Sequence, residues 1–189
     1  MKRIIKHATS EACTMMYKKG NATNNAKLLE ILLTEQHYLC AYSEEYITAT
    51  DARDVEHFNP NLKYTDADSY QNWFAVKHKI NNAKTSKWQD PILHPTALDL
   101  EERIVYDNGD YLVAAESDIA AQNLIDLIGL NDFDLPESRR KYINRRKEEF
   151  KLKGDSISDY FDWLLNHHTK EVYYIRAIEE EFGIQLTLR

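Results

Sequence analysis

The sequence predicts one α+β domain of 189 residues, and three observations lead to this class. Short aromatic and β-branched runs, separated by turn residues, occur repeatedly in the first 114 positions. From residue 117 onward, apolar residues recur with helical spacing instead. No stretch rich in proline or serine divides the chain, so we expect residues 1–189 to form a single domain.

The first half is expected to hold a helix followed by two short strands and a second helix. Residues 21–36 have a broad apolar face, and Thr23 or Asn24 is suited to cap their first turn. Residues 38–50 are aromatic and β-prone. Strands are expected at 54–58 and 73–76 and a short helix at 78–86, with the turn signal Asn59-Pro60-Asn61 and a polar loop at 61–71 between the strands.

The second half is expected to begin with a β-hairpin and to continue as helices. Asn108-Gly109 stands between two alternating runs, and both residues tolerate the positive φ that a tight hairpin turn requires. We therefore expect strands at 103–107 and 110–114, helices at 117–130 and 136–153 that end near Gly129 and Gly154, and one or two more helices within 156–182.

Composition narrows the class of protein. The 24 Lys and Arg residues against 31 Asp and Glu residues give a net charge of −7, which argues weakly against a protein that coats nucleic acid. It does not exclude a local basic face. No apolar run approaches the roughly 18 residues that span a bilayer, and the start lacks an apolar signal segment, so we expect a cytoplasmic protein without a membrane partner.

Five residues between positions 56 and 84 are of types used in phosphodiester hydrolysis: Glu56, His57, Asn72, Asn81 and Lys84. A carboxylate and a carboxamide oxygen form a sparse set of hard ligands, which suits Mg²⁺ or Mn²⁺. A neutral histidine nearby can take a proton from water near neutral pH. Adjacent strand residues point to opposite faces, so Glu56 and His57 serve one site only if the strand end is irregular or the site lies at the strand's edge.

The order of these residues resembles the HNH motif of ββα-metal nucleases. Among them it is closest to the small HNH proteins of bacterial anti-phage defence, the Septu-type and retron-associated nuclease subunits. The resemblance is carried by Cys40-Ala-Tyr-Ser43, Val55-Glu-His-Phe-Asn-Pro60, Asn72-Trp73 and Asn81-Asn-Ala-Lys84, and downstream by Ile128-Gly-Leu-Asn131, Leu135, Arg139-Arg140 and the Asp107-Asn-Gly109 hairpin, so that it covers residues 1 to about 150. It implies a ββα-metal core at about 38–88 with an additional β-hairpin, an N-terminal helix and a helical C-terminal part at about 117–189.

The resemblance also implies a role for each of the five residues. His57 matches the general base that activates water, and Glu56 matches the acidic metal ligand before it. Asn72 matches the middle residue, which holds the loop and orients the histidine through backbone hydrogen bonds. Asn81 matches the second metal ligand, with Asn82 as a rival for that role. Lys84 stands where a phosphate contact or a helix-packing residue is expected.

The sequence departs from many relatives in its cysteines. Those proteins bind a structural zinc with two Cys-x-x-Cys pairs, but here the first pair is Cys40-x-x-Ser43, and Lys77 and Ile80 occupy the likely positions of the second. One thiolate cannot complete a tetrahedral zinc site, even if His78 contributes. We therefore expect no structural Zn²⁺, and expect packing around Tyr42, Phe58 and Trp73 to replace it.

A basic cluster, Arg139, Arg140, Arg145 and Arg146, has two interpretations. It is either a face that binds the phosphate backbone or a partner protein, or a solvated helix face paired with Glu148 and Glu149. The sequence does not decide between them.

Taken with the resemblance, these residues predict a metal-dependent HNH endonuclease with Mg²⁺ or Mn²⁺ as its cofactor and nucleic acid as its substrate, DNA favoured. The resemblance implies anti-phage defence and an ABC- or AAA-type ATPase partner. Two alternatives stay open. One is a nuclease that cleaves RNA such as tRNA, because this chemistry does not need a 2′-OH. The other is a non-catalytic interaction subunit on the same scaffold.

Overall fold

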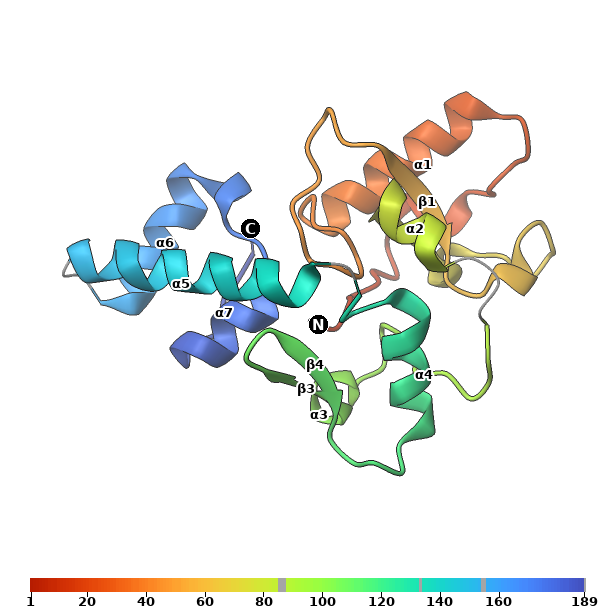
Figure 1. The fold of residues 1–189 in the computed structure, drawn as a ribbon. Helices are drawn as coiled ribbons and strands as arrows, with labels where there is room; N and C mark the ends of the chain where they lie inside the picture. Colours follow the sequence, from red (N-terminus) through yellow and green to blue (C-terminus); the bar gives the residue numbers. More distant parts are fainter. Residues whose placement is uncertain (85–87, 133, 154–155, 189) are drawn as a thin grey trace.

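The structure is a computed structural model, and it describes residues 1–84, 88–132, 134–153 and 156–188. It has the predicted α+β class, with two small antiparallel sheets and helices at both ends of the chain (Figure 1). The predicted helix stop at Gly154, and the last two residues of the helix predicted at 78–86, lie outside the described residues.

The first sheet and the helix after it form a ββα arrangement. Strand β1 (Arg53–His57) pairs with β2 (Trp73–Lys77), so that His57 lies opposite Trp73 and Glu56 opposite Phe74. Helix α2 (His78–Lys84) follows β2 without a loop. The predicted strands and short helix are therefore confirmed. Within the described residues this sheet has two strands, so no further strand pairs with the outer edge of β1 there.

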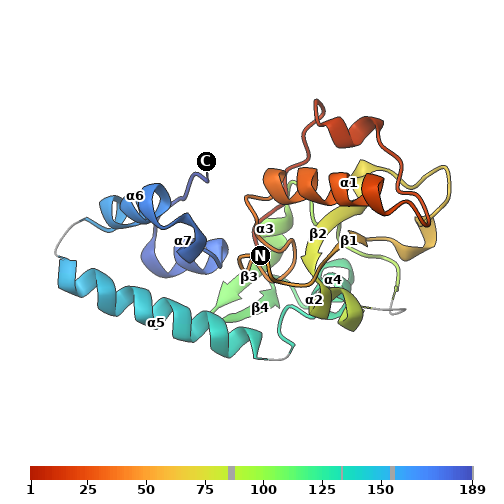
Figure 2. The ribbon, with the colours of Figure 1, turned by 90° about the horizontal axis from the view of Figure 1, so that it is seen from above.

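Helix α1 (Ala22–Glu35) packs against both strands of this sheet (Figure 2). Its N-cap is Asn21, whose side chain accepts a hydrogen bond from the Asn24 amide at 3.1 Å, so the predicted caps Thr23 and Asn24 were wrong. The β-prone segment 38–50 forms turns with one isolated bridge, Leu39 to Tyr46. The predicted packing of Tyr42, Phe58 and Trp73 is confirmed, since all three are buried in one core cluster.

The predicted hairpin is confirmed as β3 (Ile104–Asp107) and β4 (Asp110–Val113). Its turn residues Asn108 and Gly109 have φ of 44° and 98°, the left-handed region that the Asn-Gly pair was expected to supply. A short helix that the sequence did not suggest, α3 (Leu100–Arg103), precedes the hairpin.

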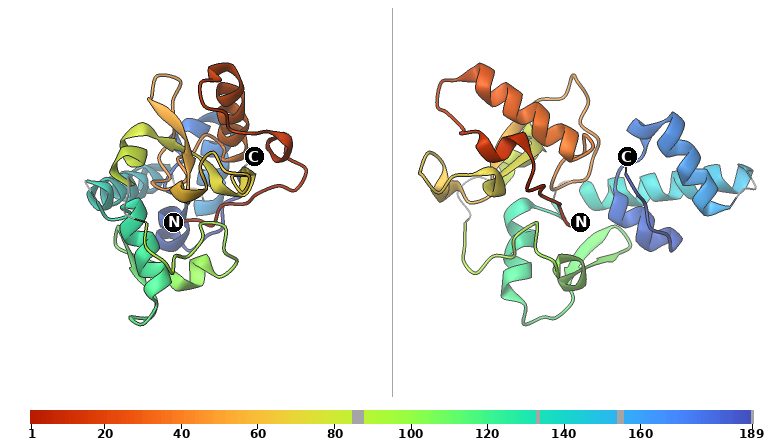
Figure 3. Two further views of the ribbon diagram at one scale, coloured as in Figure 1. Left: turned by 90° about the vertical axis from the view of Figure 1, so that its right-hand side faces the viewer. Right: turned by 180° about the vertical axis from the view of Figure 1, so that it is seen from behind.

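The C-terminal helices divide between two hydrophobic clusters. Helix α4 (Ile119–Ile128) ends at Gly129, which has φ of 60°, and packs with the first cluster around β1 and β2. The second cluster lies among α5 (Leu135–Lys153), α6 (Ile157–His167) and α7 (Ile175–Phe182) (Figure 1). Seen from behind, these three helices stand beside α1 and the hairpin, with the N-terminus between the two parts (Figure 3).

Candidate active site

The two faces of β1 carry different chemistry. Asp54 and Glu56 point to one face, and Val55 and His57 point to the other, because side chains alternate along a strand. Helix α2 packs on the acidic face. Its residues Asn81 and Lys84 are three apart, so both are directed at the strand.

The acidic face holds two separate pairs. The Asn81 carboxamide donates to Asp54 Oδ2 at 2.8 Å. The Lys84 ammonium forms an ion pair with Glu56 and donates to the His57 carbonyl oxygen at 2.8 Å. The predicted ligand pair was Glu56 with Asn81, but the carboxylate that contacts Asn81 is Asp54. The sequence did not single out Asp54, because Asp54 and Glu56 are two residues apart on the same strand face and either carboxylate fits the position of a metal ligand.

Glu56 and Lys84 are buried together, with 5% and 4% of their surface exposed. Burial raises the pKa of Glu56, and the Lys84 ammonium acts in the opposite direction. Burial likewise lowers the pKa of Lys84. Of the two roles considered for Lys84, the structure shows the packing one, since a buried ammonium that is paired with a carboxylate does not present its charge to a phosphate.

His57 lies at the end of β1 on the opposite face, and only 4% of its surface is exposed. The ring of Tyr17 meets the His57 ring edge-on at a centroid distance of 4.5 Å. Asp68 Oδ2 lies 3.1 Å from the buried Nε2 of His57, which is the distance of an ion pair, and within the described part of the chain this nitrogen makes no contact with the geometry of a hydrogen bond.

Burial lowers the pKa of His57 to about 4, and the Asp68 carboxylate partly opposes this effect. Its imidazole is therefore neutral at pH 7 and has a nitrogen lone pair or N–H available. A general base requires a neutral histidine, because one ring nitrogen must be free of a proton to accept one.

Asn72 fastens the two ends of the loop that follows β1. Its carboxamide oxygen accepts from the Asn59 amide at 2.7 Å, and its carboxamide nitrogen donates to the Asn59 carbonyl oxygen at 3.1 Å. The same nitrogen donates to Asp68 Oδ1 at 3.0 Å, which also accepts from the Trp73 indole at 2.7 Å. Two donors thus hold Asp68 beside His57. These are hydrogen bonds of the kind expected of the middle asparagine.

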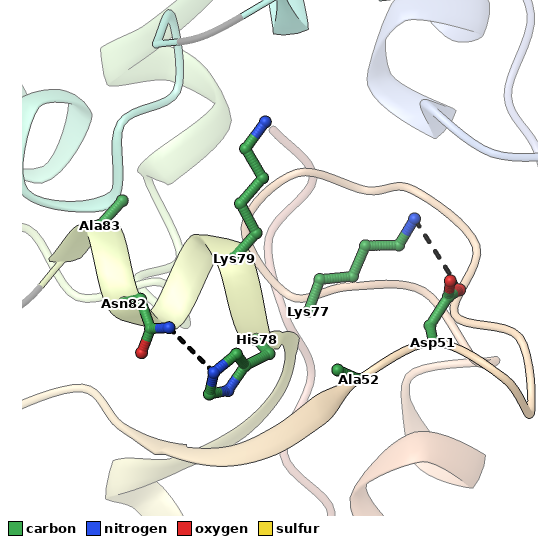
Figure 4. A pocket seen from close by; sticks show the side chains of 7 residues that line it. All are labelled: Asp51, Ala52, Lys77, His78, Lys79, Asn82 and Ala83. Carbon is green, nitrogen blue, oxygen red and sulfur yellow. Dashed lines mark hydrogen bonds and ion pairs between the residues drawn. The ribbon is translucent and has the colours of Figure 1, made fainter.

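Sequence reasoning missed Asp68, because residues 61–71 were interpreted only as a polar loop. The signal that could have found it is Trp73, since a buried indole N–H requires an acceptor. It also missed the contact of His78 with Asp54, in which His78 Nδ1 lies 2.7 Å from Asp54 Oδ2. Asn82 contacts His78 Nε2 at 2.9 Å (Figure 4). Asn81 contacts Asp54 directly.

The basic cluster on α5 needs a correction. Arg139 and Arg146 are 0% and 1% exposed, so they do not form a nucleic-acid or partner surface in this structure. Arg139 donates to the carbonyl oxygens of Gly109 and Leu130, and Arg146 donates to the Glu171 carbonyl oxygen at 2.6 Å. Their positions, seven apart, share the inward face of α5 with Tyr142 and Ile143.

The other two arginines of the cluster are more exposed. Arg140 lies 3.3 Å from Asp110, and Arg145 lies 2.8 Å from Glu149, one turn further along the helix. For Arg145 the structure therefore shows the predicted pairing on a solvated helix face.

No family model matches the chain, and no curated protein matches it. Within the described residues, no helix has the length and apolar character needed to cross a membrane.

Proposed function

We propose that this chain is a metal-dependent endonuclease of the HNH type, which hydrolyses phosphodiester bonds of nucleic acid, with DNA favoured. The observation that carries the proposal is His57, a buried neutral imidazole beside the Asp68 carboxylate, at the strand end that the HNH resemblance assigns to the general base. The β1–β2–α2 order and the loop held by Asn72 support it further.

The chain's own residues supply the proton transfer. The neutral His57 imidazole accepts a proton from the attacking water at its unprotonated ring nitrogen, and the imidazolium that forms is stabilised by Asp68, whose Oδ2 lies 3.1 Å from Nε2. Asn72 and Trp73 keep the Asp68 carboxylate in place. Because His57 is 4% exposed and Tyr17 covers it, the Tyr17 ring or the loop after β1 moves when a phosphodiester reaches the His57 ring.

A divalent cation fits one pair of oxygen donors better than the predicted pair. Glu56 is neutralised by Lys84 and does not offer a free anionic ligand. The carboxylate of Asp54 and the carboxamide of Asn81 are adjacent and partly exposed, a hard donor set of the kind that Mg²⁺ or Mn²⁺ prefers. Because Asp54 and His57 lie on opposite faces of β1, such an ion would stabilise the charge on the leaving oxygen only with the phosphodiester placed across the edge of the strand.

The resemblance also suggests the biological setting, which we include in the proposal. An ABC- or AAA-type ATPase would act as partner in anti-phage defence and deliver the nuclease to its target. The net charge of −7 supports this part, because weak intrinsic binding to nucleic acid suits an enzyme that depends on a partner.

A second candidate function, a non-catalytic interaction subunit, is favoured by a specific contact. Lys84 pairs with the carboxylate of Glu56 and thereby satisfies the residue that the HNH resemblance assigns as a metal ligand. On this alternative the buried pair serves folding alone, and the chain would bind its partner through α5–α7.

A cleavage assay with Mg²⁺ or Mn²⁺ separates these functions. Plasmid DNA, single-stranded DNA and bulk tRNA are incubated with wild type, with His57→Ala and with the control His167→Ala, which changes an exposed histidine on α6. Each protein is tested alone and with any ATPase encoded beside it. We expect metal-dependent cleavage that His57→Ala abolishes and His167→Ala retains. Absence of cleavage by folded wild type in every arm would support the interaction subunit.

A further inference from the structure

A groove of about 590 Å³ separates the base of the first sheet from the C-terminal helices. Three parts of the chain line it: the segment before β1, the end of β2, and α5 with the turn before α7. Its cations are Lys77, Lys141, Arg145 and Lys170, and its half-buried tyrosines are Tyr46 and Tyr173. Neither the fold nor the proposed general base explains why these residues converge.

The cations of the groove outnumber its carboxylates. Glu45 and Asp51 are the acidic residues that line it, and the Lys77 ammonium stays 3.7 and 3.9 Å from them. Lys141 and Arg145 pair with Glu137 and Glu149 outside the groove lining, but their side chains are 74% and 61% exposed. Exposed pairs of this kind are weak, so an incoming phosphate can compete for both cations.

The tyrosines give the groove a second kind of contact. Tyr46 is stacked on Tyr38 with centroids 6.2 Å apart, and Tyr173 lies against Tyr142 at 4.3 Å. Rings supported in this way present a rigid face on which an unpaired base can stack. Cations together with supported aromatic rings favour a single-stranded nucleic acid over an acidic peptide, which would use the cations alone.

The groove continues toward the candidate site. A second hollow, of about 650 Å³, shares Asp51 and Lys77 with it and is also lined by His78 and Asn82. Figure 4 shows Lys77 extending toward Asp51 on one side of this hollow, with His78 and Asn82 on the other. From Ala52 to His57 the strand rises about 16 Å, a distance that a few nucleotides can span.

We propose that this groove binds a single-stranded segment of nucleic acid and guides it along α2 toward β1. Its phosphates would contact Lys77, Lys141 and Lys170, and its bases would stack on Tyr46 and Tyr173. This inference rests on the proposed function, since the bound strand would be the substrate of the nuclease. Binding itself can be measured without cleavage.

The test is fluorescence anisotropy with labelled single-stranded DNA and RNA of about 15 nucleotides, in the His57→Ala background. Lys141→Glu is compared with Lys151→Glu. Both lysines are exposed on α5 and pair with a glutamate one turn earlier, but Lys151 lies outside the groove. We expect Lys141→Glu with Lys170→Glu to weaken binding at least about tenfold at low salt, and Lys151→Glu to change it less than about twofold.

Tyr46→Leu tests the stacking contact while keeping an apolar side chain. We expect it to weaken single-strand binding about fivefold or more and to leave duplex binding unchanged. Circular dichroism confirms that each variant is folded. The proposal would be overturned if Lys141→Glu and Lys151→Glu had equal effects. It would also be overturned if poly-glutamate displaced the oligonucleotide at equal charge concentration and Tyr46→Leu had no effect.

Together with the cleavage assay, this binding assay separates the groove proposal from the proposed function. Groove-dependent binding without metal-dependent cleavage by wild type would refute the nuclease and keep the groove. Cleavage that is lost in His57→Ala but unaffected by the groove variants would do the reverse.

Discussion

Asp68 Oδ2 lies 3.1 Å from Nε2 of His57, while Asp68 Oδ1 accepts hydrogen bonds from Asn72 and Trp73. One carboxylate thus connects the candidate base to the asparagine that fastens its loop. The sequence singled out His57, Asn72 and Trp73. Asp68, which it did not single out, contacts all three.

We expect Asp68→Asn to reduce cleavage about tenfold to a hundredfold while the protein stays folded. The carboxylate raises the pKa of His57 against the effect of burial, so its removal lowers this pKa further and weakens the base. NMR titration of the His57 ring reports the pKa directly. Asp66→Asn, an exposed change in the same loop, is the control. An unchanged His57 pKa in Asp68→Asn would contradict this role.

Asn72→Ala should destabilise the fold by about 1–3 kcal/mol, because it removes both hydrogen bonds to the Asn59 backbone. Urea unfolding measures the free energy of unfolding. Asn61→Ala, at an exposed position in the same loop, should stay within about 0.5 kcal/mol of wild type. Equal losses in the two variants would show that the Asn72 contacts do not hold the loop.

The stability of the protein should fall as pH decreases from about 6.5 to about 4. His57 has a pKa of about 4 when folded and an ordinary value of 6.5 when unfolded, so the unfolded chain binds the proton first. The stabilisation is complete above the unfolded value, and roughly 3 kcal/mol is lost over this window.

His57→Gln removes that titration and should flatten this part of the stability curve relative to wild type. Urea unfolding at a series of pH values measures the difference between the two proteins. Taking the difference cancels the contributions of other groups that titrate in the window, such as His94, whose pKa burial also lowers. Parallel curves would show that His57 is not buried in its neutral form.

Mn²⁺ should raise the melting temperature of wild type, by binding the folded state alone. If Asp54 and Asn81 hold the ion, Asp54→Asn abolishes this rise, whereas Glu56→Gln retains part of it. The opposite result would restore the ligand pair predicted from the sequence, and would require the Lys84–Glu56 ion pair to open when metal binds.

Arg139→Ala should cost about 3 kcal/mol or more, because it leaves the buried carbonyl oxygens of Gly109 and Leu130 unpaired. Its neighbour Arg140 is partly exposed and makes a surface pair with Asp110, so Arg140→Ala should cost less than about 1 kcal/mol. Thermal and urea unfolding give both values. Similar small losses in the two variants would argue against a structural role for Arg139.

Much of the local structure could be predicted from the sequence, because its signals act between near neighbours. Asn108-Gly109 sets a turn by its own backbone preference, and Gly129 ends α4 for the same reason. The short run at 54–58, ended by the turn signal Asn59-Pro60-Asn61, was sufficient to place β1 to within one residue. The composition likewise determined the acidic net charge without reference to any fold.

Only the tertiary structure decided which side chains meet. Asp54 and Glu56 share one face of β1, and the position of α2 along that face assigns Asn81 to the first and Lys84 to the second. Arg139 and Arg146 belong to a basic cluster in the sequence, yet packing of the C-terminal helices buries both side chains against backbone carbonyl oxygens. Spacing along a chain specifies the face of an element, whereas contact depends on how two elements pack, and that is set by the whole core.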